Sequence, residues 1–128
     1  MAENSQIKIL LIDDDKFLLD MYSMKFKKSG LEIDTSSNSL SALEKIRTNV
    51  YNIILMDIIM PGMDGLDLLK KIREEKLLPE STIIMLTNQA DDFDKAKVFG
   101  VDGYIIKATT IPSEVVDQVL SVYKNKQK

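Results

Sequence analysis

The chain has 128 residues, a formal net charge of -3 at pH 7, and neither histidine nor cysteine. This length is one domain's worth and can bury a core without cross-links. The missing residue types exclude disulfides, thiolate chemistry, histidine metal ligands and a phosphohistidine on this chain, and so mild a charge argues against electrostatic binding of nucleic acid.

In the first third of the chain, two short apolar runs flank an amphipathic segment. Residues 7–12 are apolar apart from one lysine and predict a buried strand, which three acids follow. Residues 31–35 alternate apolar and polar, so they predict a half-exposed strand near a sheet edge. Residues 16–29 have helical spacing and end at Gly30, which is typical of a left-handed helix end. The apolar positions of this helix are Phe17, Leu18, Met21 and Met24.

The central third contains a short apolar run, residues 52–57, which ends in Asp57 and predicts a strand buried on both faces of a sheet. A loop over residues 58–65 stops it. A helix precedes the strand, with N-cap candidates in residues 37–39, and another opens after it at Asp64 or Gly65 and ends before Pro79. The inward positions of the two helices are Leu40, Leu43 and Ile46, then Leu66, Leu69 and Ile72.

The last third repeats this alternation. Residues 82–87 predict a buried strand, residues 91–99 a short helix closed by Gly100, and residues 104–106 a last short strand. Pro112 suits the first turn of a final helix. The apolar face of that helix consists of Val115, Val116, Val119, Leu120 and Tyr123.

Five strands that alternate with five helices predict an α/β doubly wound parallel sheet with helices on both faces. We expect a single domain over residues 1–128, with a core of about residues 7–123 and flexible termini. The basic end, with Lys124, Lys126 and Lys128, is interpreted as a solvated helix end. No apolar run would span a bilayer and residues 1–6 lack a signal peptide's apolar region, so we expect a cytoplasmic protein that binds no membrane. The pattern leaves the order of the strands open.

Polar side chains follow four of the predicted strands. Asp13 and Asp14 follow the first, Asp57 the third, Thr87 the fourth and Lys107 the fifth. Because the carboxyl ends of parallel strands lie on one edge of the sheet, these groups are expected to converge on one crevice. Each residue alone would be unremarkable, as a turn acid, a strand-end hydroxyl or a surface lysine; their joint placement indicates a site.

The chemistry of these groups favours phosphoryl transfer with a metal ion. Neighbouring carboxylates repel one another, and a divalent cation relieves that repulsion. Oxygen ligands select a hard ion, Mg²⁺ or Mn²⁺, which also draws in phosphate. One carboxylate could attack phosphorus, while Lys107 and Thr87 bind phosphoryl oxygens.

At these residues the chain resembles the receiver domains of response regulators, from about Lys8 to Tyr123. The resemblance implies the flavodoxin-like strand order 2-1-3-4-5. The matching motifs are Leu11-Ile12-Asp13-Asp14, Met56-Asp57, Met60-Pro61-Gly62-Met63-Asp64-Gly65, Leu86-Thr87 and Gly103-Tyr104-Ile105-Ile106-Lys107.

The resemblance implies a phosphoacceptor and a metal site. Asp57 would accept the phosphoryl group, and Mg²⁺ would be held by Asp13, Asp14, Asp57 and the backbone carbonyl of Ile59. The chain would catalyse its own phosphorylation and dephosphorylation, and would not be a turnover enzyme. Its donor would be a phosphohistidine on a sensor histidine kinase or a histidine phosphotransfer protein.

The resemblance also implies a switch. Thr87 and Lys107 would contact the bound phosphoryl group, and Tyr104 would be the aromatic residue that moves inward with Thr87. Ile59 and Gln89 would tune the phosphoryl lifetime. Because an apolar Ile59 should not orient an attacking water, we expect a long-lived aspartyl phosphate.

The switched surface would be the fourth helix, fifth strand and fifth helix, from about Ala90 onward, and would bind a downstream protein target. Nucleic acid would not be bound directly. Val101, Tyr104 and the final helix could form a phosphorylation-dependent homodimer, and Phe17 and Leu18 could dock a kinase. Without a linker or an output domain in the sequence, we expect a stand-alone protein.

The residue after Lys107 departs from the family, where proline on a cis bond is usual. Here it is Ala108, for which a cis bond costs roughly 2.5–4 kcal/mol. We therefore expect either a strained cis Lys107–Ala108 bond or a trans bond with a remodelled loop through Thr110. Asp15 is an additional acid, for which we expect helix capping.

Two other functions are considered. The run Asp13-Asp14-Asp15 also resembles the start of haloacid-dehalogenase-type phosphatases, in which Asp13 would be the nucleophile and Asp15 the acid/base, with Thr87 and a lysine helping. That interpretation leaves Asp57 without a role. A phosphorylation-independent adaptor would keep the fold only, and the complete set of acids, Thr87 and Lys107 argues against it.

Overall fold

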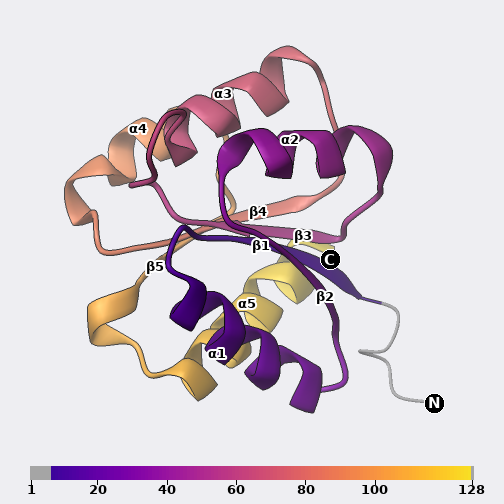
Figure 1. Ribbon diagram of the computed structural model, residues 1–128, viewed down its shortest axis with the longest axis vertical. Helices are drawn as coiled ribbons and strands as arrows, with labels where there is room; N and C mark the ends of the chain where they lie inside the picture. Colours follow the sequence, from indigo (N-terminus) through magenta and orange to yellow (C-terminus); the bar gives the residue numbers. More distant parts are fainter. Residues whose placement is uncertain (1–6, 128) are drawn as a thin grey trace.

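The computed structural model describes residues 7–127 and shows a parallel sheet between two layers of helices (Figure 1). The strands lie in the order β2-β1-β3-β4-β5, so the doubly wound order that the resemblance implied is confirmed. Residues 1–6 and Lys128, which belong to the termini expected to be flexible, lie outside the described residues. The strands are β1 (Lys8–Ile12), β2 (Glu32–Ser36), β3 (Ile53–Met56), β4 (Thr82–Thr87) and β5 (Gly103–Ile106).

Helices α1 and α5 cover one face of the sheet, and α2, α3 and α4 cover the other (Figure 1). The fourth helix is shorter than predicted because residues 90–92 form a separate 3₁₀ turn. No helix within residues 7–127 has the length and apolarity needed to cross a bilayer. The helical elements are α1 (Lys16–Lys28), α2 (Ser39–Thr48), α3 (Gly65–Glu74), η2 (Ala90–Asp92), α4 (Phe93–Val98), η3 (Lys107–Thr109) and α5 (Pro112–Gln127).

The core has two halves because successive side chains of a strand point to opposite faces. In β3, Ile53 and Leu55 pack toward α1 and α5, whereas Ile54 and Met56 pack toward α2 and α3. Strands β1, β3 and β4 are apolar on both faces, as expected for strands covered on both sides. Strand β2 lies at the edge of the sheet and is partly exposed, as predicted.

Two of the four apolar positions named for α1, Leu18 and Met21, pack against the core while partly buried, and the other two do not. Phe17 and Met24 are 74% and 62% exposed, and the side chains buried against the sheet are Leu19, Tyr22 and Phe26. Helix α1 carries apolar residues on more than one side, so their spacing does not decide which side meets the sheet.

Smaller corrections apply to α2 and α3. Leu40 is 67% exposed, while Ala42 joins Leu43 and Ile46 in the core. In α3, Leu69 and Ile72 are fully buried as predicted, Leu68 joins them, and Leu66 is only partly buried at the edge of that cluster. The buried apolar side chains of both helices share one core cluster with side chains of β1, β3 and β4.

Side-chain caps begin the first three helices. Asp15 accepts hydrogen bonds from the N–H groups of Phe17 and Leu18 at 3.0 and 3.3 Å, so its predicted capping role is confirmed. Asn38 and Asp64 cap α2 and α3 in the same manner. Gly30, which ends α1, has the positive φ of 84° that was expected there.

The last helix extends into the basic tail and is anchored there. It continues to Gln127, beyond the expected end of the core at residue 123. Lys126 donates hydrogen bonds to the carbonyl of Ser81 at 2.7 Å and to the Asp102 carboxylate at 3.0 Å. Residues 124–127 are exposed, as expected, but the Lys126 ammonium joins α5 to the amino ends of β4 and β5.

Replacing Tyr51 with phenylalanine tests a polar contact at the edge of the core. The Tyr51 ring is 1% exposed, and its hydroxyl donates a hydrogen bond to Asp34 Oδ2 at 2.8 Å. Because a bond to a charged acceptor is lost while the ring remains, we expect the free energy of unfolding to fall by about 1–2 kcal/mol. Urea denaturation measures this change, and an unaltered midpoint would show that the hydroxyl contributes nothing.

Candidate functional site

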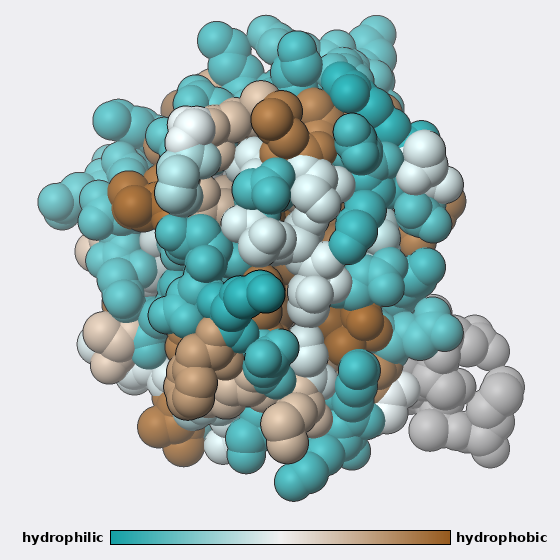
Figure 2. Space-filling model, viewed as in Figure 1, coloured by the Kyte–Doolittle hydropathy of each residue, from teal (hydrophilic) through white to brown (hydrophobic). Residues whose placement is uncertain are grey.

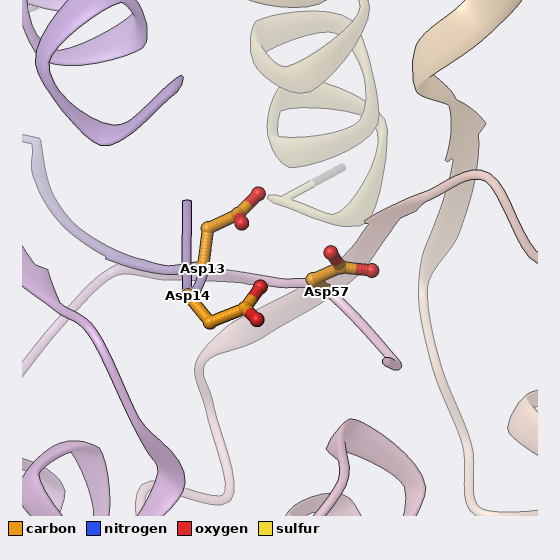
Figure 3. A group of neighbouring side chains, drawn as sticks. All are labelled: Asp13, Asp14 and Asp57. Atoms are coloured by element: carbon orange, nitrogen blue, oxygen red, sulfur yellow. The ribbon is translucent and has the colours of Figure 1, made fainter. Parts of the chain in front are cut away.

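The predicted side chains meet at the carboxyl edge of the sheet. Asp13 and Asp57 are 1% and 7% exposed, Thr87 is fully buried, and Asp14 is exposed at the rim. Figure 3 shows Asp13 and Asp14 leaving the chain next to one another, with Asp57 beside them. They border an open pocket of about 290 Å³. Its lining residues are Asp13, Asp14, Asp15, Leu18, Asp57, Ile59, Thr87, Asn88, Gln89 and Lys107.

Backbone contacts fix Asp57 at the end of β3. Its N–H donates to the carbonyl of Ile12 at 3.0 Å, which continues the pairing of β3 with β1. Its carboxylate Oδ1 accepts the N–H of Ile58 at 2.7 Å. The chain then turns sharply, and the N–H of Gly65 donates to the Ile58 carbonyl at 2.7 Å. The start of α3 is thereby packed directly against the Asp57 peptide.

Lys107 joins the two buried acids. Its Nζ lies 2.7 Å from Asp13 Oδ2 and 2.8 Å from Asp57 Oδ2. Burial by itself disfavours the ammonium, but the hydrogen bonds and charges of the two carboxylates outweigh burial and raise the pKa of Lys107. Lys107 therefore stays charged at neutral pH, in a position from which it reaches both carboxylates.

Burial dominates the titration of Asp13. Desolvation raises the pKa of Asp13, although hydrogen bonds from Lys107 and from the N–H of Asp15 act in the opposite direction. The neighbouring charge of Asp57 raises it further. Without a cation, the ionised form of Asp13 is thus disfavoured in the folded protein.

Replacing Asp13 with asparagine tests this pKa in protein kept free of metal by EDTA. An acid whose pKa is raised in the folded protein stabilises the fold when the pH lies below its ordinary pKa, which is 3.8 for Asp13. This stabilisation is lost as the pH rises through the pKa of the folded protein. Since an amide does not ionise, we expect Asp13→Asn to gain stability relative to the parent as pH rises from below 3.8 to neutrality. Urea denaturation at both pH values measures the difference, and a pH-independent difference would contradict the raised pKa.

The three acids fit a divalent cation. Asp13, Asp14 and Asp57 each offer one carboxylate oxygen, and these oxygens lie within 4.8 Å of one another. Hard oxygen donors of this kind suit Mg²⁺. Two of the acids are buried and share one ammonium, so a negative charge remains that a cation would neutralise.

A single residue connects Thr87 with Tyr104. The N–H of Gln89 donates to Thr87 Oγ1 at 3.2 Å, and the Tyr104 hydroxyl donates to the Gln89 carbonyl. The ring of Phe93 meets the Tyr104 ring edge-on at 5.5 Å. Burial, followed by the charge of Asp92, raises the pKa of Tyr104, so its hydroxyl remains a donor at neutral pH. A displacement of Thr87 would therefore alter the hydrogen bond of Gln89 and, through Gln89, the hydrogen bond of the Tyr104 hydroxyl.

Of the two configurations predicted for the Lys107–Ala108 bond, the structure has the trans one. None of the peptide bonds in residues 7–127 is cis, so the Lys107–Ala108 bond is trans. The chain continues as the short 3₁₀ helix η3 and reaches Thr110 in an extended conformation. Ile59, which the resemblance placed at a kinetic position, is 56% exposed at the rim of the pocket.

Sequence reasoning missed two residues at this edge. Asn88 accepts a hydrogen bond from the N–H of Ala108 at 2.7 Å, and Phe93 packs against Tyr104. The available signal for Asn88 was its place directly after Thr87, where an amide side chain can substitute for a backbone partner. Nothing in the spacing of Phe93 distinguished it from an ordinary helical position.

Comparisons with known proteins agree with this geometry. Residues 9–119 match the family described as response regulator receiver domain. The transcriptional regulatory protein ResD of Bacillus subtilis (strain 168) is 33% identical over 126 residues, which are 97% of this chain and 51% of ResD. The chain spans about half the length of the curated relatives it matches.

Two solved structures share the whole fold. Chemotaxis response regulator CheY4 of Vibrio cholerae has a TM-score of 0.84 and 25% identity, covering 91% of this chain and 98% of CheY4. Response regulator TrrA of Thermotoga maritima, solved in complex with Mg²⁺-BeF, has a TM-score of 0.80 and 28% identity, covering 91% of this chain and 99% of TrrA. With its strand order, its acidic cluster and the match over residues 9–119, the chain belongs to the response-regulator receiver domain family of two-component systems.

Proposed function

We propose that this receiver accepts a phosphoryl group on Asp57 and uses it to switch a protein-binding surface. The observation that carries this proposal is the contact of Asp57 with the Lys107 ammonium at 2.8 Å, beside Asp13 and Asp14 at the mouth of an open pocket. Asp57 alone among these acids stands at the end of the central strand β3, in contact with both the ammonium and the first turn after the strand.

The residues present can perform the transfer. A carboxylate oxygen of Asp57 forms a bond to phosphorus while the bond from phosphorus to the donor atom breaks, and the donor keeps that electron pair. Lys107 and the Thr87 hydroxyl would then bind phosphoryl oxygens. Asp13, Asp14, Asp57 and the Ile59 carbonyl would hold Mg²⁺, or Mn²⁺ in its place, and the bound ion supplies charge neutralisation.

The phosphoryl group would act through Thr87. It adds about two negative charges and strong acceptor oxygens, toward which the Thr87 hydroxyl can donate. Such a donation would compete with the contact between Thr87 and Gln89, and through Gln89 with the Tyr104 hydroxyl. The two states would therefore differ at α4, β5 and α5, the surface that a downstream protein would recognise.

A partner with a phosphohistidine would supply the group, a proposal supported by membership of the receiver-domain family of two-component systems. We assign this role to a sensor histidine kinase or a histidine phosphotransfer protein in the cytoplasm. The curated relatives ResD and SrrA are named transcriptional regulatory proteins. We propose that the surface of α4, β5 and α5 passes the signal on by binding a downstream protein.

The phosphatase interpretation is less well supported by the contacts. It would require Asp15 as acid/base, but the Asp15 carboxylate accepts the N–H groups of Phe17 and Leu18 as the cap of α1. It would also leave Asp57, paired with Lys107 at 2.8 Å, without a chemical role.

Intact-protein mass spectrometry after incubation with acetyl phosphate tests the proposal. We expect a single phosphoryl adduct that forms with Mg²⁺, fails to form with EDTA, and maps to Asp57 after borohydride reduction of the acyl phosphate. An apolar, exposed Ile59 should make this adduct persist well beyond seconds. Steady phosphatase turnover without an adduct, lost in Asp13→Asn but kept in Asp57→Ala, would favour the enzyme; neither adduct nor turnover would favour the adaptor.

A further inference from the structure

Asn88 links the two strand ends that carry Thr87 and Lys107. Its Oδ1 accepts the backbone N–H of Ala108 at 2.7 Å. Thr87 pairs with Ile106 as the last step of the ladder between β4 and β5, so this bond lies just beyond the end of the ladder. The Asn88 side chain thus provides the acceptor that a backbone carbonyl would provide within the sheet.

Apart from this bond and the ammonium of Lys107, the segment that carries Lys107 makes only long contacts within residues 7–127. The 3₁₀ helix η3 has no side-chain cap at Ile106. The N–H of Thr110 lies 3.4 Å from the Lys107 carbonyl, and the Thr109 hydroxyl lies 3.4 Å from the Ile106 carbonyl. The bond from Ala108 to Asn88 is shorter than both, so it is the best-defined restraint on the backbone of η3.

The position of η3 matters because Lys107 is its first residue. The Lys107 ammonium contacts Asp13 and Asp57 at 2.7 and 2.8 Å at the same time. An ammonium that must reach two fixed acceptors tolerates little movement of its backbone, and small displacements at a reacting centre cost disproportionate rate.

We propose that Asn88 is a positioning residue that holds Lys107 in place for phosphorylation of Asp57, an inference that rests on the proposed function. Asn88 acts through the Ala108 N–H. It borders the same pocket as Thr87, and its replacement leaves both carboxylates, the hydroxyl and the ammonium chemically intact.

A double-mutant cycle with Ala108→Pro tests the route of this effect, because proline has no N–H to donate in either isomer of the bond after Lys107. Any change of that isomer is common to both arms of the proline background. The rate of Asp57 phosphorylation by acetyl phosphate with Mg²⁺ is measured for the parent, Asn88→Ala, Ala108→Pro and the double variant. We expect Asn88→Ala to slow the parent about three- to tenfold, the effect of one net hydrogen bond. In the Ala108→Pro background the same substitution should have no effect.

Asn52→Ala is the matched control. The Asn52 side chain accepts the N–H of Lys8 at 2.8 Å, an equivalent contact at the opposite edge of the sheet. We expect both asparagine variants to lower stability, but only Asn88→Ala to slow phosphorylation and to speed hydrogen exchange of the Ala108 amide. Asn88→Asp, which keeps an acceptor, should restore the amide protection.

The outcomes separate this inference from the proposed function. A parent that forms the adduct, with Asn88→Ala at the parental rate, would overturn the positioning role and leave the receiver function intact. An equal slowing in the alanine and proline backgrounds at position 108 would also overturn it, because Asn88 would then act by another route. A parent that forms no adduct would overturn the receiver proposal and the positioning role together.

Discussion

Replacing Asp57 with asparagine is expected to reduce phosphorylation by acetyl phosphate to background. The amide keeps the size of the carboxylate and can still accept the Ile58 N–H, which the acid accepts at 2.7 Å. It lacks the anionic oxygen that would attack phosphorus, and it removes one of the two carboxylates held by Lys107. The readout is intact mass with Mg²⁺ present, on protein whose folding is checked by circular dichroism.

Three control variants make this result specific. Asp13→Asn and Asp14→Asn should still form the adduct, but at higher Mg²⁺ concentration, because each removes one oxygen of the acidic cluster. Asp117→Asn, on the exposed side of α5, should behave as the parent. An adduct that survives in Asp57→Asn and maps to Asp13 or Asp14 would show that Asp57 is not the phosphoacceptor and that the acceptor lies at the end of β1.

Replacing Gly65 with alanine is expected to destabilise the fold and to damage the site together. A Cβ on Gly65 would lie 2.1 Å from the carbonyl oxygen of Asp57 and 2.8 Å from Cα of Ile58. Both contacts are with backbone, so no side chain can rotate away. Either α3 or the end of β3 must shift, and we expect a loss of about 3 kcal/mol or more in the free energy of unfolding.

Two other glycines calibrate this prediction. Gly62 has a φ of +77° and open space around its Cα, so Gly62→Ala measures backbone strain alone, about 1 kcal/mol. In Gly103→Ala the new Cβ meets side-chain atoms of Val122 at 3.1 Å, which can yield. Urea denaturation should therefore rank Gly65→Ala as the most damaging, with slower phosphorylation in its folded fraction. A loss for Gly65→Ala equal to that for Gly62→Ala would show that α3 yields easily.

The sequence alone determined the alternation of strands and helices and the residues at the strand ends. Continuous apolar runs such as residues 83–86 suit strands buried on both faces, because successive side chains of a strand point to opposite faces of the sheet and here both faces are covered. Parallel pairing then requires Asp13, Asp57, Thr87 and Lys107 to share one edge, and they do. The helix caps at Asp15 and Asn38 could also be predicted from the local sequence, because a cap bonds only to the first turn of its own helix.

Only the tertiary structure decided which side of each helix faces the sheet and which distant groups touch. Helix α1 has apolar side chains on several sides, and its packing selected Phe26 over Phe17. The contacts of Lys107 with two acids, of Asn88 with Ala108 and of Lys126 with Asp102 each join separate elements. Local periodicity carries no information about such pairs, because their distances are set by how the strands are ordered and how the loops turn.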